Sequence, residues 1–448
     1  MSKIRILIAK NKHVVLLIIF LAASLFRFWL ADKGWHVDMW SNAAWGEWIY
    51  EHGPAKFYEN SIWAYSWPTQ LPVINSTYAF NKQMYIEILG RSAGLEYQLN
   101  KILPGSSVPW LTNWVAWFGY GKVNIEIPFQ IGYLVTMKLL PILADMVIAS
   151  VIYYVGKRKL LWPGIYLVSP FTWYLSAGWG QYDGMGFALA LLSFLSIFST
   201  LGFLGPALIT LAILVKPTSL ILLPFFGYLY LRQKNQSGAV KILGLILPLL
   251  IFWVTTQPYT HKNPFEFARY DLTRIVFEKS EPRLTVNSFN LWRVFIGNAG
   301  ERDNIRWLSL VIFGILNVIG AYIWEKNQGT RAALWKSLFV VSMGSFLFMT
   351  GMLERYAFAG IVFGLLTVTN KPHLLKYWLA MSVIFWINLY YHWWWPEWLF
   401  PLKSILSWNQ DFVTRILSGL QVILFAKLIL ENFRRLPPRP AGMQKNSA

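Results

Sequence analysis

Long apolar runs alternate with short polar segments along most of the chain. Eleven runs can be marked, near residues 14–31, 128–155, 160–178, 184–204, 205–231, 242–256, 307–324, 333–350, 356–369, 374–391 and 411–430. A helix that spans the hydrocarbon core of a bilayer needs about 20 mostly apolar residues. The pattern therefore predicts an all-α, polytopic integral membrane protein.

The apolar run over 205–231 does not fit a simple crossing. It contains Lys216-Pro217 at its centre, and proline removes a backbone donor and breaks a helix. A single crossing would also leave the basic residues Arg232 and Lys234 outside the cytoplasm, against the usual charge bias. Two half-helices that dip in and return avoid this. We therefore predict about ten full spans plus one broken helix pair.

Composition and charge support a membrane protein and argue against nucleic acid as a partner. Of the 448 residues, 56% are hydrophobic and 14% are charged, and the net charge is +19. With the N-terminus in the cytoplasm, the cytoplasmic segments carry +17 and the outer segments carry −3. Basic charge thus follows the positive-inside rule. Both termini are predicted to be cytoplasmic, in a multi-pass protein of the cell membrane, or of the endoplasmic reticulum in a eukaryote.

Two outer segments are too long to be simple connections, and long structured loops are usually functional. The first is predicted to open with an amphipathic helix that starts near Asp38 and stops at Gly53-Pro54. The predicted organisation is a cytoplasmic N-terminus and first span (1–31), a first outer loop (32–127), a transmembrane core (128–256), a second outer loop (257–305), C-terminal spans (306–430) and a cytoplasmic tail (431–448).

Placing an ionisable group in or beside a membrane costs free energy, so such groups are functional candidates by default. Those expected near the outer boundary are Arg27, Asp38, Asp183, Lys216, Glu354 and Arg355. Asp183 lies in the glycine-rich turn 178–186, where glycine is expected to let backbone approach a ligand closely. Lys138 and Asp145 lie on one helix face, too far apart to pair directly.

Simpler interpretations stay open for several of these residues. Asp38 would also serve as a helix N-cap, a position that favours aspartate. Glu354-Arg355 would also be ordinary charges at the start of a helix. The absence of cysteine excludes thiol catalysis and thiolate metal sites. The histidines show no metal-ligand spacing, and His36 and His392 among them are interpreted as interface residues.

Carboxylates and cations at an outer boundary suit sugar transfer from a lipid-linked phosphate. A hydroxyl acceptor must lose a proton as it attacks, which calls for a carboxylate general base. The leaving phosphate develops charge, which calls for arginine or lysine. No phosphate loop or dinucleotide fingerprint is present, so a nucleotide-sugar donor has no visible binding site.

Five short motifs resemble, in this order along the chain, those of the GT-C superfamily of polyprenyl-phosphate-sugar-dependent glycosyltransferases. They are Val37-Asp38-Met39, Trp179-Gly-Gln-Tyr-Asp183, Lys216-Pro-Thr218, Asn287-Ser-Phe-Asn-Leu-Trp292 and Glu354-Arg355-Tyr356. The nearest relatives by this resemblance are dolichyl-phosphate-glucose glucosyltransferases and bacterial polyprenyl-phosphate-mannose mannosyltransferases. The resemblance implies a core of about seven helices with variable C-terminal spans, an external helix over 263–270, and Asp38 as the catalytic base.

The sequence departs from the family at one motif, because Leu353 stands where the family has histidine. A phosphate contact or proton transfer by that histidine therefore does not carry over, and Arg355 is expected to take over its charge. The substrate-binding residues that the motifs and charges suggest are Gln181, Trp179, Lys216, Glu354, Arg355, Arg27, Asn290 and Trp292.

The resulting hypothesis is an inverting transferase that moves mannose or glucose from a polyprenyl-phosphate carrier to a hydroxyl of a glycan, lipid or protein. Asp38 acts as the base and Asp183 is the second choice. Arg355, with Lys216 and Arg27, binds the phosphate, while Gln181 and Asp183 position hydroxyls. No metal or other cofactor is required, because side-chain cations can neutralise a monophosphate leaving group.

Two alternatives belong to other classes. A flippase or transporter of lipid-linked saccharides would share the groove and the cations. It would also need a polar path through both leaflets, and the sequence shows no inverted repeat. A glycan polymerase or ligase would use a lipid-diphosphate donor and more outer basic residues than this chain has.

Overall fold

The structure, a computed structural model, describes residues 11–60, 66–102, 109–121, 129–233, 236–260, 263–275, 283–297 and 305–433. Within these ranges the regular structure is helical, apart from two short paired strands. The all-α prediction is therefore confirmed. The cytoplasmic ends predicted before residue 11 and after residue 433 lie outside the described residues.

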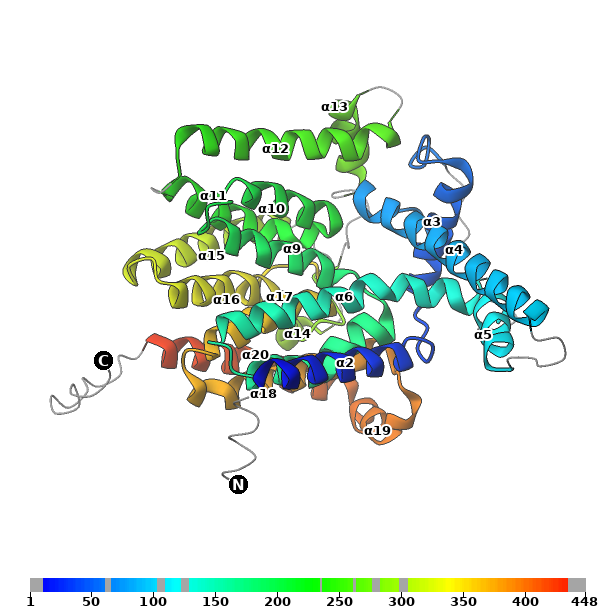
Figure 1. The fold of residues 1–448 in the computed structure, drawn as a ribbon. Helices are drawn as coiled ribbons and strands as arrows, with labels where there is room; N and C mark the ends of the chain where they lie inside the picture. Colours follow the sequence, from blue (N-terminus) through cyan, green and yellow to red (C-terminus); the bar gives the residue numbers. More distant parts are fainter. Residues whose placement is uncertain are drawn as a thin grey trace.

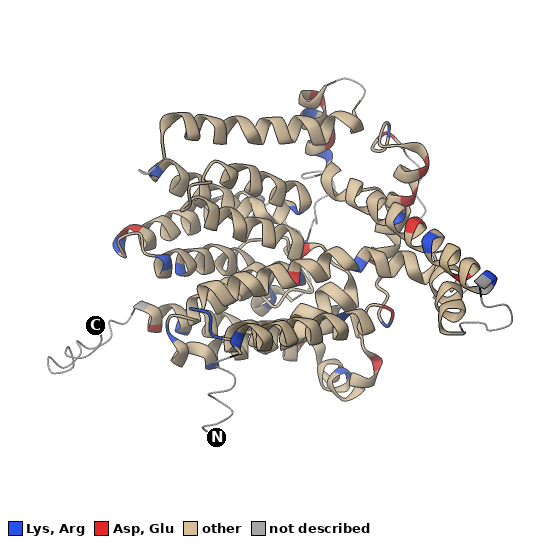
Figure 2. Ribbon diagram, viewed as in Figure 1, with Lys and Arg blue, Asp and Glu red and all other residues tan. Residues whose placement is uncertain are grey.

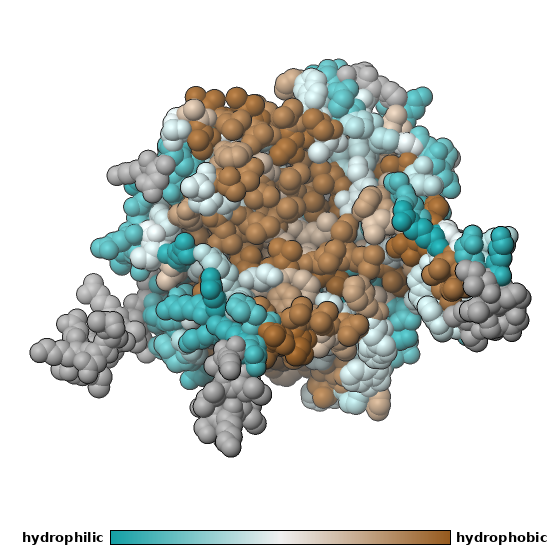
Figure 3. All heavy atoms as spheres, in the orientation of Figure 1, coloured by the Kyte–Doolittle hydropathy of each residue, from teal (hydrophilic) through white to brown (hydrophobic). Residues whose placement is uncertain are grey.

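Six helices in the described part are long and apolar enough to cross a membrane. They are α2 (Lys12–Leu30), α6 (Ile131–Val155), α12 (Gly238–Thr256), α15 (Arg306–Lys326), α16 (Arg331–Phe348) and α20 (Gln410–Phe433). Charged residues are sparse along the middle of these helices and gather toward the two ends of the molecule (Figure 2). Figure 3 shows a broad apolar band between two hydrophilic ends. These features are those of a multi-pass membrane protein.

Other predicted spans are interrupted or short. The run over 160–178 folds as α7 (Leu161–Val168), α8 (Pro170–Trp173) and the π-helical turn η1 (Tyr174–Trp179). The runs near 184–204 and 356–369 give α9 (Asp183–Ser196), of 14 residues, and α17 (Phe358–Val368), of 11. A 14-residue helix is about 21 Å long, shorter than a hydrocarbon core of about 30 Å. The number of full crossings therefore stays a prediction.

The broken stretch has the geometry that its proline predicts. Helix α10 (Leu204–Val215) ends at Lys216, and η2 (Pro217–Leu222) leads into α11 (Leu223–Arg232). The side-chain amide of Gln236 donates to the carbonyl of Ile197 at 3.0 Å. This bond places the exit of α11 beside the turn between α9 and α10. The chain thus enters and leaves at the same end of the molecule, and Lys216 lies at the turn between the two halves. Helices α10 and α11 lie between α12 and α15 (Figure 1).

The two largest hydrophobic cores among the described residues hold most of the helices together. The larger joins α6, α7, α9, α16, α17 and α18 (Leu375–Trp393). The smaller joins α6 to α3 (Val37–His52), α4 (Pro72–Ile102) and α5 (Pro109–Tyr120). Met185 and Leu189 of α9 contact both cores. Helix α3 ends at Gly53, which has a φ of 76°, so the predicted stop is confirmed.

Short elements complete the end of the molecule that carries α3. They include η3 (Gln257–Tyr259), α13 (Pro264–Phe267), η4 (Ala268–Leu272), α14 (Leu291–Ile296), η7 (Glu354–Ala357), η9 (Glu397–Leu399) and α19 (Phe400–Trp408), while η8 (Pro372–Leu374) precedes α18. Strand β1 (Thr285–Val286) pairs in parallel with β2 (Met352–Leu353). This pairing brings the second long loop next to Glu354.

Candidate active site

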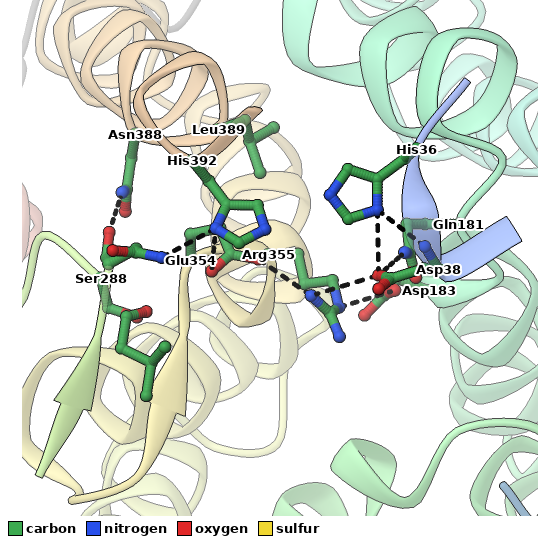
Figure 4. Close-up of polar contacts among 12 residues, drawn as sticks. His36, Asp38, Gln181, Asp183, Ser288, Glu354, Arg355, Asn388, Leu389 and His392 are labelled. Atoms are coloured by element: carbon green, nitrogen blue, oxygen red, sulfur yellow. Dashed lines mark hydrogen bonds and ion pairs between the residues drawn. The ribbon is translucent and has the colours of Figure 1, made fainter. Parts of the chain in front are cut away.

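The carboxylate of Asp38 is held by a side chain from a distant segment. Helix α3 is capped by His36, whose Nδ1 accepts a hydrogen bond from the Asp38 backbone N–H at 3.1 Å. The interpretation of Asp38 as the N-cap is therefore wrong. Its Oδ2 instead accepts from Nε2 of Gln181 at 2.7 Å (Figure 4). The Asp38 side chain is 35% exposed, so a substrate can reach it.

The turn that carries Gln181 depends on glycine, but for packing. Gly180 adopts a φ of 76°, and a Cβ there would lie 2.9 Å from Sδ of Met39. A Cβ on Gly178 would lie 2.6 Å from the Trp395 ring, and one on Gly186 would lie 2.7 Å from Cβ of Lys216. The expectation that glycine opens the backbone to a ligand is wrong at these positions, because protein side chains fill the space.

Arg355 lies at the centre of a group of carboxylates. Its Nη1 donates to Oε1 of Glu354 at 2.9 Å and lies 4.0 Å from Oδ2 of Asp38. Its Nε lies 3.9 Å from Oδ2 of Asp183 and makes no hydrogen bond within the described ranges. The guanidinium also lies 5.6 Å from the centre of the Trp179 ring. A guanidinium has five N–H donors, so most of those on Arg355 remain available for an anion.

Asp183 and Lys216 form a close buried pair. The ammonium of Lys216 lies 2.9 Å from Oδ2 of Asp183, and both side chains are less than 10% exposed. Asp183 begins α9, and Lys216 comes from the tip of the broken pair. Because Asp183 is already paired with a cation, it is a poorer candidate for the base than Asp38.

Two histidines that the sequence analysis assigned to the interface belong to this group. His392, in the last turn of α18, has its Nδ1 2.8 Å from Nδ2 of Asn287 and 3.8 Å from Oε2 of Glu354. Its ring stacks on that of Trp179, with the ring centres 5.1 Å apart. The ring centres of His392 and His36 are 5.4 Å apart (Figure 4). A histidine thus lies beside Glu354 although position 353 is leucine. No local motif points to His392, because it lies near the end of α18 and is separated from Glu354 by α17 and most of α18.

The charges on these residues follow from burial and from Arg355. Burial lowers the pKa of His36 to about 4, so the ring is neutral at pH 7. Burial alone would raise the pKa of Asp38, but the Arg355 guanidinium and other positive groups outweigh it and bring this pKa below its usual 3.8. Asp38 is therefore ionised at neutral pH. Burial would lower the pKa of Arg355, yet Glu354 and Asp38 hold it above its usual value.

Two cavities of opposite character meet at Arg355. The first has an empty volume of about 530 Å³ and polar walls that include Asp38, Ser41, Asn42, Gln70, Gln181 and Lys216. The second has an empty volume of about 630 Å³, and its walls include the apolar side chains of Phe187, Ile221, Leu222, Phe346, Met352 and Phe358. Arg355 lines both cavities. The arrangement suits a molecule with a polar part, an anionic centre and an apolar part.

Three of the predicted site residues lie elsewhere. Arg27 is fully buried and pairs with Asp145 at 2.9 Å, so the structure does not bring it to Arg355. Asn290 caps α14 through the backbone N–H of Arg293. Trp292 donates its indole N–H to the carbonyl of Phe348. The structure does bring together Asp38, Trp179, Gln181, Asp183, Lys216, Glu354 and Arg355.

The buried ammonium of Lys138 links two chain segments that carry site residues. Its ammonium donates to the carbonyl oxygens of Ala31, Gly34 and Gly178 at 2.8, 2.6 and 2.7 Å. The first two carbonyls belong to the loop before His36, and the third belongs to the turn before Trp179. Lys138 therefore ties together the two segments that present Asp38 and Gln181.

Comparison with known proteins gives no further assignment. Neither a scan against protein-family models nor a search of curated proteins finds a match to this chain. Across the described ranges, no three histidine, aspartate or glutamate side chains are arranged to hold a metal ion.

Proposed function

We propose that this protein is an inverting glycosyltransferase that moves mannose or glucose from a polyprenyl-phosphate carrier to a hydroxyl of a glycan, lipid or protein. The observation that carries the proposal is the position of Arg355. It lies 4.0 Å from the partly exposed carboxylate of Asp38 and lines both the polar and the apolar cavity. The transfer takes place at the outer face of a membrane that the chain crosses about ten times, with both termini in the cytoplasm.

Asp38 is the general base. Its carboxylate takes the proton of the acceptor hydroxyl while the hydroxyl oxygen attacks the anomeric carbon of the donor. The bond between that carbon and the phosphate oxygen breaks, and polyprenyl phosphate leaves with the electron pair. Gln181, which donates to Asp38 at 2.7 Å, fixes the orientation of the carboxylate.

Arg355 and Lys216 stabilise the departing phosphate. The N–H groups of Arg355 that make no hydrogen bond to the described residues can bind phosphate oxygens, and charge-assisted bonds of this kind are strong. The isoprenoid tail then lies on the apolar side of Arg355 and the hexose on the polar side. Because these cations neutralise a monophosphate, transfer requires no metal, and we expect EDTA to leave the rate unchanged.

Donor binding also activates the base. In the free protein Arg355 holds the pKa of Asp38 below its usual value, which makes the carboxylate a weak base. A phosphate bound to Arg355 offsets the positive charge and raises the pKa of Asp38 again. A base works best when its pKa approaches the working pH. The general base is therefore strongest when the donor is in place.

The decisive experiment uses the purified protein with radiolabelled polyprenyl-phosphate mannose or glucose and membrane lipids as acceptors. We expect label to leave the monophosphate carrier and to appear in a product. Movement of an intact lipid-linked saccharide across vesicles, with no label released, would indicate a flippase instead. Release from a diphosphate carrier alone would indicate a polymerase or ligase.

A further inference from the structure

The polar cavity contains one buried amide that the mechanism above does not use. We propose that Asn42 binds two neighbouring hydroxyls of the donor hexose and so helps to set which sugar is transferred. Asn42 follows Asp38 by one helical turn on α3, so the two side chains lie on the same helix face. Both line the polar cavity.

The side chain of Asn42 has no partner in the part of the chain that the structure describes. It is only 7% exposed, yet it makes no hydrogen bond to any residue within the described ranges. Two other asparagines near the site behave differently. Asn75 donates to the Tyr58 hydroxyl at 2.8 Å, and Asn81 donates to the Tyr182 hydroxyl at 2.7 Å. Buried amides are normally paired, so the unpaired amide of Asn42 indicates a partner that comes from the cavity.

The donor hexose is the part of the substrate that reaches Asn42. This step rests on the proposed function, in which the phosphate lies at Arg355 and the lipid tail lies on its apolar side. The hexose then occupies the polar cavity, whose wall also includes Ser41 and Gln70. An amide has one acceptor oxygen and two N–H donors. It can accept from one sugar hydroxyl and donate to the next, which makes it selective for their arrangement.

The test pairs an Asn42→Ala variant with a series of polyprenyl-phosphate hexoses that each lack one hydroxyl. Two neutral hydrogen bonds correspond to a loss of about 10–100-fold in kcat/KM. We expect this loss for Asn42→Ala with the complete donor. For the wild type, each donor that lacks one contacted hydroxyl removes one of the two bonds, so we expect a loss of about 3–10-fold in kcat/KM. In Asn42→Ala, replacing the complete donor by one of these donors should cause no further loss in kcat/KM, because the variant has already lost both bonds.

Matched variants distinguish a loss of sugar recognition by Asn42 from damage to the fold. Asn370 is exposed beyond α17, at the opposite end of the molecule, so Asn370→Ala should leave kcat/KM unchanged. Because Asn42 makes no hydrogen bond to the described residues, Asn42→Ala should keep the thermal midpoint of the wild type. Asn42→Asp keeps the shape but removes the N–H donors. It should lose transfer to the same extent or more.

Three results would overturn the proposal. Losses that simply add for every donor would mean that Asn42 does not contact the donor hexose. Non-additive losses found only with acceptors that lack a hydroxyl would assign Asn42 to the acceptor. Both results leave the proposed function standing, because the wild type still transfers sugar. A wild type that releases no label from any monophosphate carrier would overturn both proposals together.

Discussion

Two buried arginine–aspartate groups in this protein have similar composition but opposite character. In the closed group, around Arg27 and Asp145, every nitrogen of the guanidinium donates to a protein atom. The acceptors are Oδ2 of Asp145 at 2.9 Å, Oγ1 of Thr172 at 2.8 Å, and the carbonyls of Leu167 and Ala23 at 3.2 and 3.3 Å. Asp145 also accepts from Tyr166 and Ser176. This group joins α2, α6 and the segment 166–176 and has no capacity for a ligand.

The open group, around Asp38 and Arg355, leaves its bonding capacity unused. Within the described residues Arg355 makes one hydrogen bond, to Glu354, and its nitrogens lie 4.0 and 3.9 Å from the nearest carboxylate oxygens of Asp38 and Asp183. It also lines two cavities, whereas Arg27 is fully enclosed. Burial and charge alone therefore do not identify a functional site in a membrane protein. Unused donors beside a cavity do.

The largest expected effect comes from Asp38→Asn, which removes the base and keeps the shape. Loss of a general base typically lowers a rate by about 10²–10⁴-fold. We expect transfer to fall at least about 100-fold, with donor binding and the thermal midpoint unchanged. Asp32→Asn is the control, because Asp32 pairs with Lys33 near the surface of the same loop. Near-full activity of Asp38→Asn would remove Asp38 from the mechanism.

The next prediction compares the two groups by making the same change in each. Lysine keeps the charge but lacks the planar fork of arginine. For Arg355→Lys we expect a loss of about 10–100-fold in kcat/KM for the donor, with an unchanged thermal midpoint. For Arg27→Lys we expect the free energy of unfolding to fall by about 1–3 kcal/mol, with unchanged kcat/KM in the protein that remains folded.

Activity assays and thermal unfolding of both variants provide the measurements. The reverse pattern, with stability lost at position 355 and donor affinity lost at position 27, would show that the open and closed groups have been assigned the wrong way round. Equal losses in both assays for both variants would remove the distinction altogether.

The sequence predicts the helical membrane architecture and most members of the open group. The long apolar runs predict the helical membrane architecture, because the length of such a run is enough to recognise a membrane span. The proline after Lys216 determines the shape of the broken pair. The members of the open group lie at the ends of different helices on the same side of the predicted topology, so their meeting at one end of the molecule could be anticipated.

The remaining errors concern contacts between distant segments. Arg27 has its partner on α6, and only the packing of α2 against α6 brings Asp145 within reach. His392 reaches Glu354 through the placement of α18, which no local pattern encodes. The glycines at 178, 180 and 186 face side chains from elsewhere in the chain rather than a ligand. The sequence gives the residue types, but only packing decides which of them meet.

The smallest expected effect is a shift in pH dependence, and it tests whether phosphate binds at the open group. Asp38 is active only when deprotonated, so activity is present above its pKa and is lost as the pH falls through it. In the free protein this pKa lies below 3.8, and the acid limb of kcat/KM should lie there too. With the donor bound, phosphate offsets Arg355, so the acid limb of kcat should lie at a higher pH than the acid limb of kcat/KM.

His36 must be separated from this effect, because its pKa of about 4 lies in the same range. His392, Lys216 and Arg355 also act on Asp38, but Lys216 and Arg355 stay charged throughout an acid titration. His36→Asn removes the nearer histidine and keeps a good N-cap for α3, so the difference between the two limbs should survive in this variant. If the acid limb of kcat lies at the same pH as the acid limb of kcat/KM, or at a lower pH, the donor phosphate does not offset the charge of Arg355. Arg355 would then serve only to neutralise protein carboxylates, in the same way as Arg27 neutralises Asp145.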